Sequence, residues 1–206
     1  MELKQQYLAY LNALDKDACI KLITSSLDEK KIDLYTVYDS ILTHALDEVV
    51  DMDHNVWQEH IKTQIVRTTL ESLYPYVIKQ ALPKKYKIAV VCPEGEYHEL
   101  GGRLVSDYFR LLGFEVYYLG NSLPKNELVD LVKECKLNAL AISVSNFYTM
   151  SALNTMIKLV NTANPSLPII LGGRAVEHNP SGAKGNNLSI CKTYDDIVKV
   201  IEALKL

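Results

Sequence analysis

The fold prediction for this chain starts from the stretch KIAVVC, residues 87–92, and extends along the sequence in both directions. This run is short, apolar and rich in β-branched residues, which is typical of a strand buried on both faces of a sheet. It follows Pro83-Lys84-Lys85, the point at which the spacing of apolar residues changes. We therefore expect two domains, residues 1–82 and residues 86–206, with different secondary structure.

Downstream of this strand, short apolar runs alternate with helical patterns. Further strands are expected at residues 115–119, 138–143, 168–171 and 188–190, and helices at 100–112, after Pro124, at 151–163 and from Tyr194. Such alternation predicts an α/β fold, a Rossmann-like (flavodoxin-like) five-stranded parallel sheet with right-handed crossovers. Ligands of these sheets bind beyond the carboxyl ends of the strands, so the loops after strands one, three and four are the places to search.

Upstream, the apolar residues recur at helical spacing with no strand-like alternation. Asp17 and Asp33 are predicted to cap the second and third helices. The polar string at residues 51–55 ends the third helix, and a fourth is expected over residues 56–81 with a kink at Pro75. Four helices joined by short loops predict an antiparallel four-helix bundle.

The composition excludes several classes of protein. Lysine and arginine total 22 and aspartate and glutamate 25, a net charge of −3, which argues against direct DNA binding. The four cysteines are scattered, as in a reduced cytoplasmic protein rather than a disulfide scaffold. Neither a signal peptide nor a run of about 20 apolar residues is present. We expect a cytoplasmic protein that does not enter a membrane.

The loop after the first strand contains an acid and a histidine two residues apart, Glu96 and His98. One imidazole nitrogen can bind a metal while the other donates to the carboxylate, which fixes the tautomer. Gly101 and Gly102 follow, where a bulky ligand could approach the backbone. Taken alone, a loop histidine is more often a solvated or capping residue.

Two further signals follow the third and fourth strands. Ser143 and Ser145 place alternating hydroxyls after the third strand, and Gly172-Gly173 follows the fourth. A glycine pair leaves no side chain to obstruct a ligand, although by default it marks only a turn.

Together these residues resemble the cobalamin-binding domain family, whose pattern is (D/E)xHxxG, then SxT or SxL, then GG. Here the gaps contain 41 residues (102–142) and 26 residues (146–171), as the family places them. The helical half resembles the cap that precedes such modules, so the resemblance covers the whole chain. Two departures, the longer acid Glu96 and Ser145 in place of the commoner Thr, keep the hydrogen-bonding groups.

The resemblance implies a role for each position. His98 would coordinate cobalt from below, displacing the dimethylbenzimidazole base of the cofactor, and Glu96 would bind the other imidazole nitrogen. The displaced nucleotide tail would meet Ser143 and Ser145 and pass over Gly172-Gly173.

The expected fourth helix also carries Glu59-His60, with Trp57 three residues before the histidine. This resembles the cap of cobalamin-dependent photoreceptor regulators, in which a Trp and an EH pair face the upper ligand. That Trp would fall at position 49, where this chain has Val49. Trp57 and His60 would share a helix face and cover the corrin. The alternative is that Trp57 packs inside the bundle and His60 is an ordinary polar residue.

His54 is a further candidate. It would be a second axial ligand of cobalt after the upper group is lost. The alternative is that His54 is an exposed turn residue.

The resemblance therefore implies a cobalamin-binding sensor or photoreceptor-like regulator that holds its cofactor base-off and His-on and is not itself an enzyme. Adenosylcobalamin is favoured as the cofactor, with methyl- or hydroxocobalamin as alternatives. Because no basic helix-turn-helix precedes the first helix, signalling would pass through a protein partner, and self-association is open.

Two alternatives remain. The first is a corrinoid methyl-carrier that partners a methyltransferase, although such carriers have HDIGKN where this chain has HELGGR. The second is a family member that has lost the cofactor and binds only protein partners. A radical mutase would need a large catalytic barrel as well.

Overall fold

The computed structural model describes residues 2–50, 56–121 and 123–206. Its internal contacts divide the chain into two compact units, Met1–Gln80 and Ala81–Leu206. The first is helical and the second is an α/β unit, and each is described by itself below.

The helical unit consists of α-helices of different lengths and one π-helical turn. Its elements are α1 (Leu3–Asn12), α2 (Lys16–Asp28), α3 (Leu34–Thr36), a π-helical turn (Val37–Leu42), α4 (Thr43–Val50), α5 (Val56–Ser72) and α6 (Tyr74–Gln80). Asp33 caps the third helix as predicted, because its carboxylate accepts a hydrogen bond from the Thr36 N–H. The prediction for Asp17 was wrong: Asp15 caps α2, and Asp17 lies in its first turn.

Two irregularities interrupt the predicted helices. The third helix is one rod whose middle is π-helical, and the Thr43 hydroxyl donates to the carbonyl of Tyr38, five residues earlier, at 2.9 Å. The fourth helix breaks at Leu73 into α5 and α6, because Pro75 lacks the N–H that a continuous helix would use. The polar string at residues 51–55 lies outside the described residues.

The α/β unit contains a five-stranded sheet with β2-β1-β3-β4-β5 order, and every pair is parallel. Its strands are β1 (Tyr86–Val91), β2 (Phe114–Gly120), β3 (Ala139–Ser143), β4 (Ile169–Gly172) and β5 (Leu188–Ile190). Its helices are α7 (Leu100–Leu111), α8 (Lys125–Glu134), α9 (Met150–Ala163), α10 (Arg174–His178) and α11 (Tyr194–Leu204). The predicted α/β fold class, with a helical N-terminal part and a Rossmann-like parallel sheet, is confirmed.

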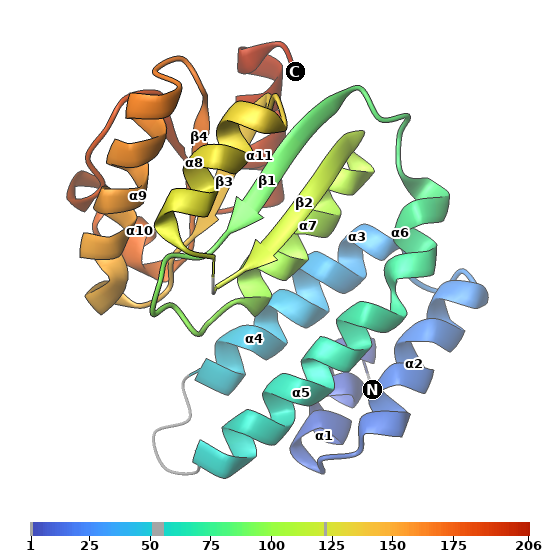
Figure 1. Ribbon diagram of the computed structural model, residues 1–206. Helices are drawn as coiled ribbons and strands as arrows, with labels where there is room; N and C mark the ends of the chain where they lie inside the picture. Colours follow the sequence, from blue (N-terminus) through green and yellow to red (C-terminus); the bar gives the residue numbers. More distant parts are fainter. Residues whose placement is uncertain (1, 51–55, 122) are drawn as a thin grey trace. The chain divides into compact units, whose positions relative to one another are not determined.

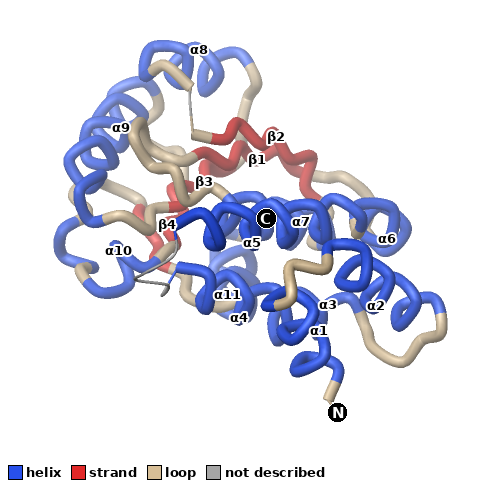
Figure 2. The backbone as a smooth tube through the Cα atoms, turned by 90° about the horizontal axis from the view of Figure 1, so that it is seen from below, coloured by secondary structure: helices blue, strands red, loops and turns tan. Residues whose placement is uncertain are grey.

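Helices cover both faces of this sheet, as Figures 1 and 2 show. One face packs on α8 and α9, which contribute Leu128, Leu153 and Ile157 to the apolar core. The other face is covered by α7 and α11, where Phe109 meets Phe114 edge-on with ring centroids 5.6 Å apart. Burial on both faces explains why these strands are continuous apolar runs.

The sheet reverses its direction of growth at β1. The chain passes from β1 to β2 on one side, and β3 lies on the other side of β1. The loops after β1 and β3 therefore leave neighbouring strands in opposite directions, which is where doubly wound sheets bind ligands. In the part of the chain that the structure describes, no helix has the length and apolarity that crossing a bilayer requires.

Candidate functional site

A fully buried carboxylate joins the two loops at the point of strand reversal. The Glu96 side chain is 0% exposed and accepts hydrogen bonds from both loops. Its Oε1 accepts from the backbone N–H of His98 at 2.9 Å. Its Oε2 accepts from the N–H groups of Ser145 at 2.8 Å and Asn146 at 2.7 Å, and from the Thr149 hydroxyl at 3.3 Å.

These donors keep Glu96 ionised although it is buried. Burial by itself would raise the pKa of the carboxyl group. The hydrogen bonds from the His98 ring and from three backbone N–H groups outweigh burial and lower the pKa to about 2. At neutral pH this carboxylate can only accept hydrogen bonds.

The expected contact between Glu96 and the imidazole of His98 is present, with His98 Nδ1 at 2.7 Å from Glu96 Oε1. Because the carboxylate only accepts, Nδ1 carries the proton and donates it, and in the neutral ring Nε2 holds the lone pair. The His98 side chain is 41% exposed, whereas Glu96 is buried beneath it. The pair can thus present an oriented nitrogen ligand at the surface of the unit.

Gly101 and Gly102 bring the first turn of α7 against the end of β3. A Cβ at Gly101 would lie 3.5 Å from the Ser143 Oγ, and one at Gly102 would lie 3.3 Å from the Ser143 Cβ. Ser143 is only 9% exposed, and among the described residues its hydroxyl has no hydrogen-bond partner. This is a nearly buried polar atom beside a backbone without side chains, which suits a polar ligand.

The glycine pair after β4 includes one position, Gly173, at which the backbone requires glycine. Gly173 has φ +101°, and a Cβ there would lie 2.4 Å from the carbonyl oxygen of Val144. The same carbonyl accepts a hydrogen bond from the Ala175 N–H at 3.1 Å. Gly173 must therefore be glycine to let two loops cross, whatever ligand binds nearby. A Cβ at Gly172 would make only a 3.4 Å contact with the Cys191 carbonyl.

The three candidate residues of the helical unit lie near the start of α5. Trp57 is 58% exposed, so its ring does not pack inside the bundle, and His60 is exposed as well. Glu59 is half-buried. His54 lies outside the described residues.

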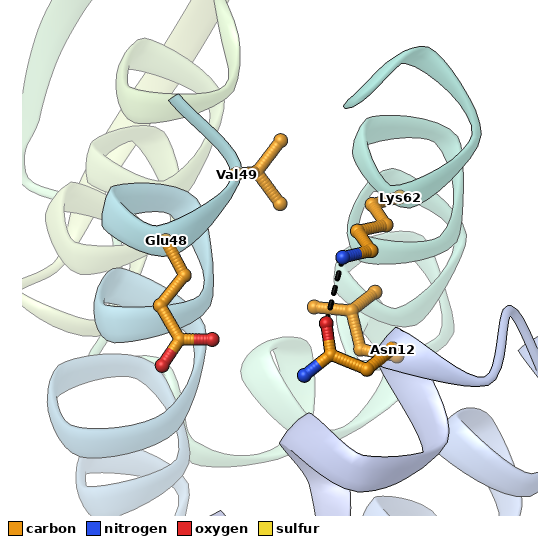
Figure 3. A pocket seen from close by; sticks show the side chains of 5 residues that line it. Asn12, Glu48, Val49 and Lys62 are labelled. Carbon is orange, nitrogen blue, oxygen red and sulfur yellow. Dashed lines mark hydrogen bonds between the residues drawn. The ribbon is translucent and has the colours of Figure 1, made fainter. Parts of the chain in front are cut away.

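Val49, at the position where the photoreceptor resemblance expects a Trp, is 3% exposed. It lines a pocket of about 230 Å³ inside the helical unit, with Leu11, Asn12, Glu48 and Lys62. Figure 3 shows Val49 and Lys62 projecting from facing helices, and Lys62 Nζ donates to Asn12 Oδ1 at 2.6 Å. As far as the described residues show, there is space for a larger side chain at this position.

Sequence reasoning missed the short 3₁₀ helix Phe147–Thr149 and its link to Glu96. Asn146 caps this helix by accepting from the Tyr148 N–H at 2.9 Å, and Thr149 returns to Glu96. The signal was an Asn three residues before a Thr, a local pattern common to many turns.

Comparison with known families identifies the α/β unit. The B12 binding domain model matches residues 86–198, beginning at the first residue of β1. The chain belongs to the B12-binding domain family. Residues 86–198 thus form a cobalamin-binding domain with a Rossmann-like fold, and the Glu96–His98 pair lies in the first loop of that domain.

Two curated proteins are similar in sequence to this chain. The HTH-type transcriptional repressor CarA of Myxococcus xanthus is 21% identical over 172 residues, 83% of this chain and 58% of CarA. Dimethylamine corrinoid protein 1 of Methanosarcina mazei is 28% identical over 82 residues, 39% of this chain and 38% of that protein. The chain thus spans less than two thirds of either relative.

Among solved structures, the monomethylamine corrinoid protein of Methanosarcina barkeri superposes with a TM-score of 0.77. The match has 19% identity and covers 98% of this chain and 97% of that one. It supports the fold, a helical part followed by a Rossmann-like part.

Proposed function

We propose that this protein binds cobalamin with His98 as the lower ligand of cobalt and serves as a regulatory module that acts through a protein partner. The observation that carries the cofactor assignment is the 2.7 Å contact between Glu96 and His98 Nδ1. That contact fixes the tautomer and ring orientation, so that Nε2 is the nitrogen that would ligate a metal.

The residues present fit a corrinoid. A corrinoid supplies a cobalt centre that carries an exchangeable upper ligand. One protein nitrogen suffices on the lower side, and His98 offers it. Ser143, whose nearly buried hydroxyl lies against the glycines of α7, would bind polar groups of the displaced nucleotide tail together with Ser145. Gly172 would leave the wall of that tail site open.

The chain's own residues then hold the cofactor without moving a proton. Glu96 stays ionised and keeps Nδ1–H engaged, which makes Nε2 a better donor to cobalt. It also fastens the loop after β3 to the loop after β1, so that the ligand and the tail site are positioned together.

The regulatory role is supported by two observations. The similarity to the repressor CarA extends over 83% of this chain. In α5, Trp57 and His60 stand exposed three residues apart, on a common helix face, beside the half-buried Glu59. These residues would cover the upper ligand, for which we favour adenosyl. Loss of that ligand would change the conformation of the helical unit and hence a partner-binding surface.

A methyl-carrier function is the second candidate. It is favoured by the similarity to a dimethylamine corrinoid protein in M. mazei. In that case the partner would be a methyltransferase, and the upper ligand would be methyl or a solvent ligand.

Absorption spectroscopy tests both levels of the proposal. The protein is mixed in the dark with adenosyl-, methyl- or hydroxocobalamin, desalted and then illuminated. His98→Ala is run beside it, with His44→Ala as the matched control, because the His44 side chain is 43% exposed and lies in the helical unit. The proposal requires that the wild-type protein retains corrin absorption bands, and that these bands shift in His98→Ala but not in the control variant.

A light-dependent change in small-angle scattering with adenosylcobalamin supports the regulatory role. If that change is absent and methylcobalamin binds tightly, the methyl-carrier role is supported. Desalting that removes every cobalamin would refute the cofactor assignment.

A further inference from the structure

Three large aromatic side chains stand in solvent beside the Glu96–His98 pair. Tyr97 is 82% exposed, Phe147 53% and Tyr148 94%. We name these three residues the aromatic rim. Large apolar groups gathered in solvent next to a candidate ligand site indicate a surface that a bound molecule covers.

The backbone of the aromatic rim is fixed before any ligand arrives. Tyr97 lies between Glu96, which is buried, and His98, which is bonded to Glu96 through both its N–H and its ring. The other two rim residues are in the 3₁₀ helix that Asn146 caps and Thr149 ties to the same carboxylate. The rim therefore loses only side-chain freedom when it is covered.

The ring of Phe147 lies against the imidazole of His178, with centroids 6.3 Å apart. Phe147 remains 53% exposed beside this contact. The aromatic rim thus comprises one residue of the loop after β1 and two of the 3₁₀ helix after β3, and His178 of α10 lies beside it.

Resting on the proposed function, we infer that the aromatic rim binds the corrin ring itself and contributes affinity independent of the nucleotide tail. A macrocycle ligated at its central metal by His98 extends several ångströms on every side of that nitrogen. Its edge carries methyl and methylene groups, for which aromatic side chains are suitable partners. The tail, by contrast, would be bound by the serine hydroxyls and glycine backbone at the strand ends.

Two corrinoids separate ring contacts from tail contacts. Hydroxocobalamin has both ring and nucleotide tail, and hydroxocobinamide has the ring alone. Their dissociation constants are measured by spectral titration with the wild-type protein, Tyr97→Ser, Phe147→Ser and Tyr148→Ser. Tyr35→Ser, which removes another exposed tyrosine (41%), is the control, and Ser143→Val is the tail-site comparator.

Each rim variant is expected to weaken binding of both corrinoids about tenfold, the effect of roughly 1.4 kcal/mol, and to keep the His98-dependent spectral shift. Ser143→Val should weaken hydroxocobalamin only, and Tyr35→Ser neither. Because the rim side chains are exposed, thermal unfolding of the variants should match that of the wild type.

Two results would overturn the inference, and they differ. Rim variants that bind both corrinoids as tightly as the wild type would leave the proposed function intact and assign the rim to another occupant, such as a protein partner. A wild-type protein that binds neither corrinoid would end the proposed function and the rim assignment together.

Discussion

Glu96 and Ser145 lie 49 positions apart in the sequence, yet the Ser145 N–H donates to Glu96 Oε2 at 2.8 Å. The other oxygen of the same carboxylate holds the ring and the backbone of His98. One side chain therefore organises both the metal-ligand candidate and the loop after β3. Glu96 is thus as much a structural residue as a partner of the imidazole.

Glu96→Gln is expected to lower the free energy of unfolding by about 2–3 kcal/mol. An amide has one acceptor oxygen and a donor NH₂ group, which would face N–H groups that now meet Oε1 or Oε2. Urea denaturation of the cofactor-free protein measures the change. Glu94→Gln is the matched control, since Glu94 is exposed and forms only a surface ion pair with Lys125 at 3.2 Å, which predicts a change within about 0.5 kcal/mol. Equal losses in the two variants would contradict the structural role of Glu96.

Gly173→Ala is expected to destabilise the α/β unit by about 2–4 kcal/mol, through a strained positive φ and a clash with backbone. The Cβ would lie 2.4 Å from the Val144 oxygen, which is backbone and cannot swing aside. Gly101→Ala is the control, because its Cβ would meet the Ser143 hydroxyl at an ordinary 3.5 Å. Thermal unfolding followed by circular dichroism makes the comparison. A Gly173→Ala protein as stable as Gly101→Ala would show that the glycine serves only the ligand.

The architecture could be predicted from the sequence because strands that are buried on both faces of a sheet are continuous apolar runs. Runs such as residues 87–92 carry no polar alternation, and their order with helices admits few topologies. The Glu96–His98 contact could also be predicted, since the two residues are local. The Ser145 and Asn146 donors could not, because they depend on how the loop after β3 folds back onto β1.

Other features were hidden for different physical reasons. The sequence pattern indicates that Gly172-Gly173 leaves a ligand site open. In the structure, position 173 requires glycine because a Cβ there would clash with the backbone of Val144. The π-helical turn at Val37–Leu42 leaves no clear mark, because apolar residues keep their helical spacing around it. The cap at Asp15 was assigned to Asp17 because both acids precede the same apolar stripe.

Val49→Trp is expected to be tolerated, with a change in the free energy of unfolding within about 1 kcal/mol, because the pocket of about 230 Å³ beside it can receive the larger ring. Val66→Trp is the control. Val66 is 1% exposed in the core of the same unit, where added volume should cost about 2–3 kcal/mol. Urea denaturation distinguishes the two variants. Comparable losses would show that the pocket cannot accommodate an indole ring.

A double-mutant cycle tests how the helical unit is held together between α1 and α5. The buried Tyr7 hydroxyl donates to Thr69 Oγ1 at 3.1 Å, across 62 positions of sequence, and both residues are 0% exposed. Thr69→Val should cost about 1–3 kcal/mol, because it leaves a buried hydroxyl without its acceptor. Adding Tyr7→Phe removes that unsatisfied group, so the double variant should be more stable than Thr69→Val alone. Unfolding free energies of the wild type, the two single variants and the double variant give the coupling. Strictly additive losses would mean that this hydrogen bond contributes nothing to joining α1 and α5.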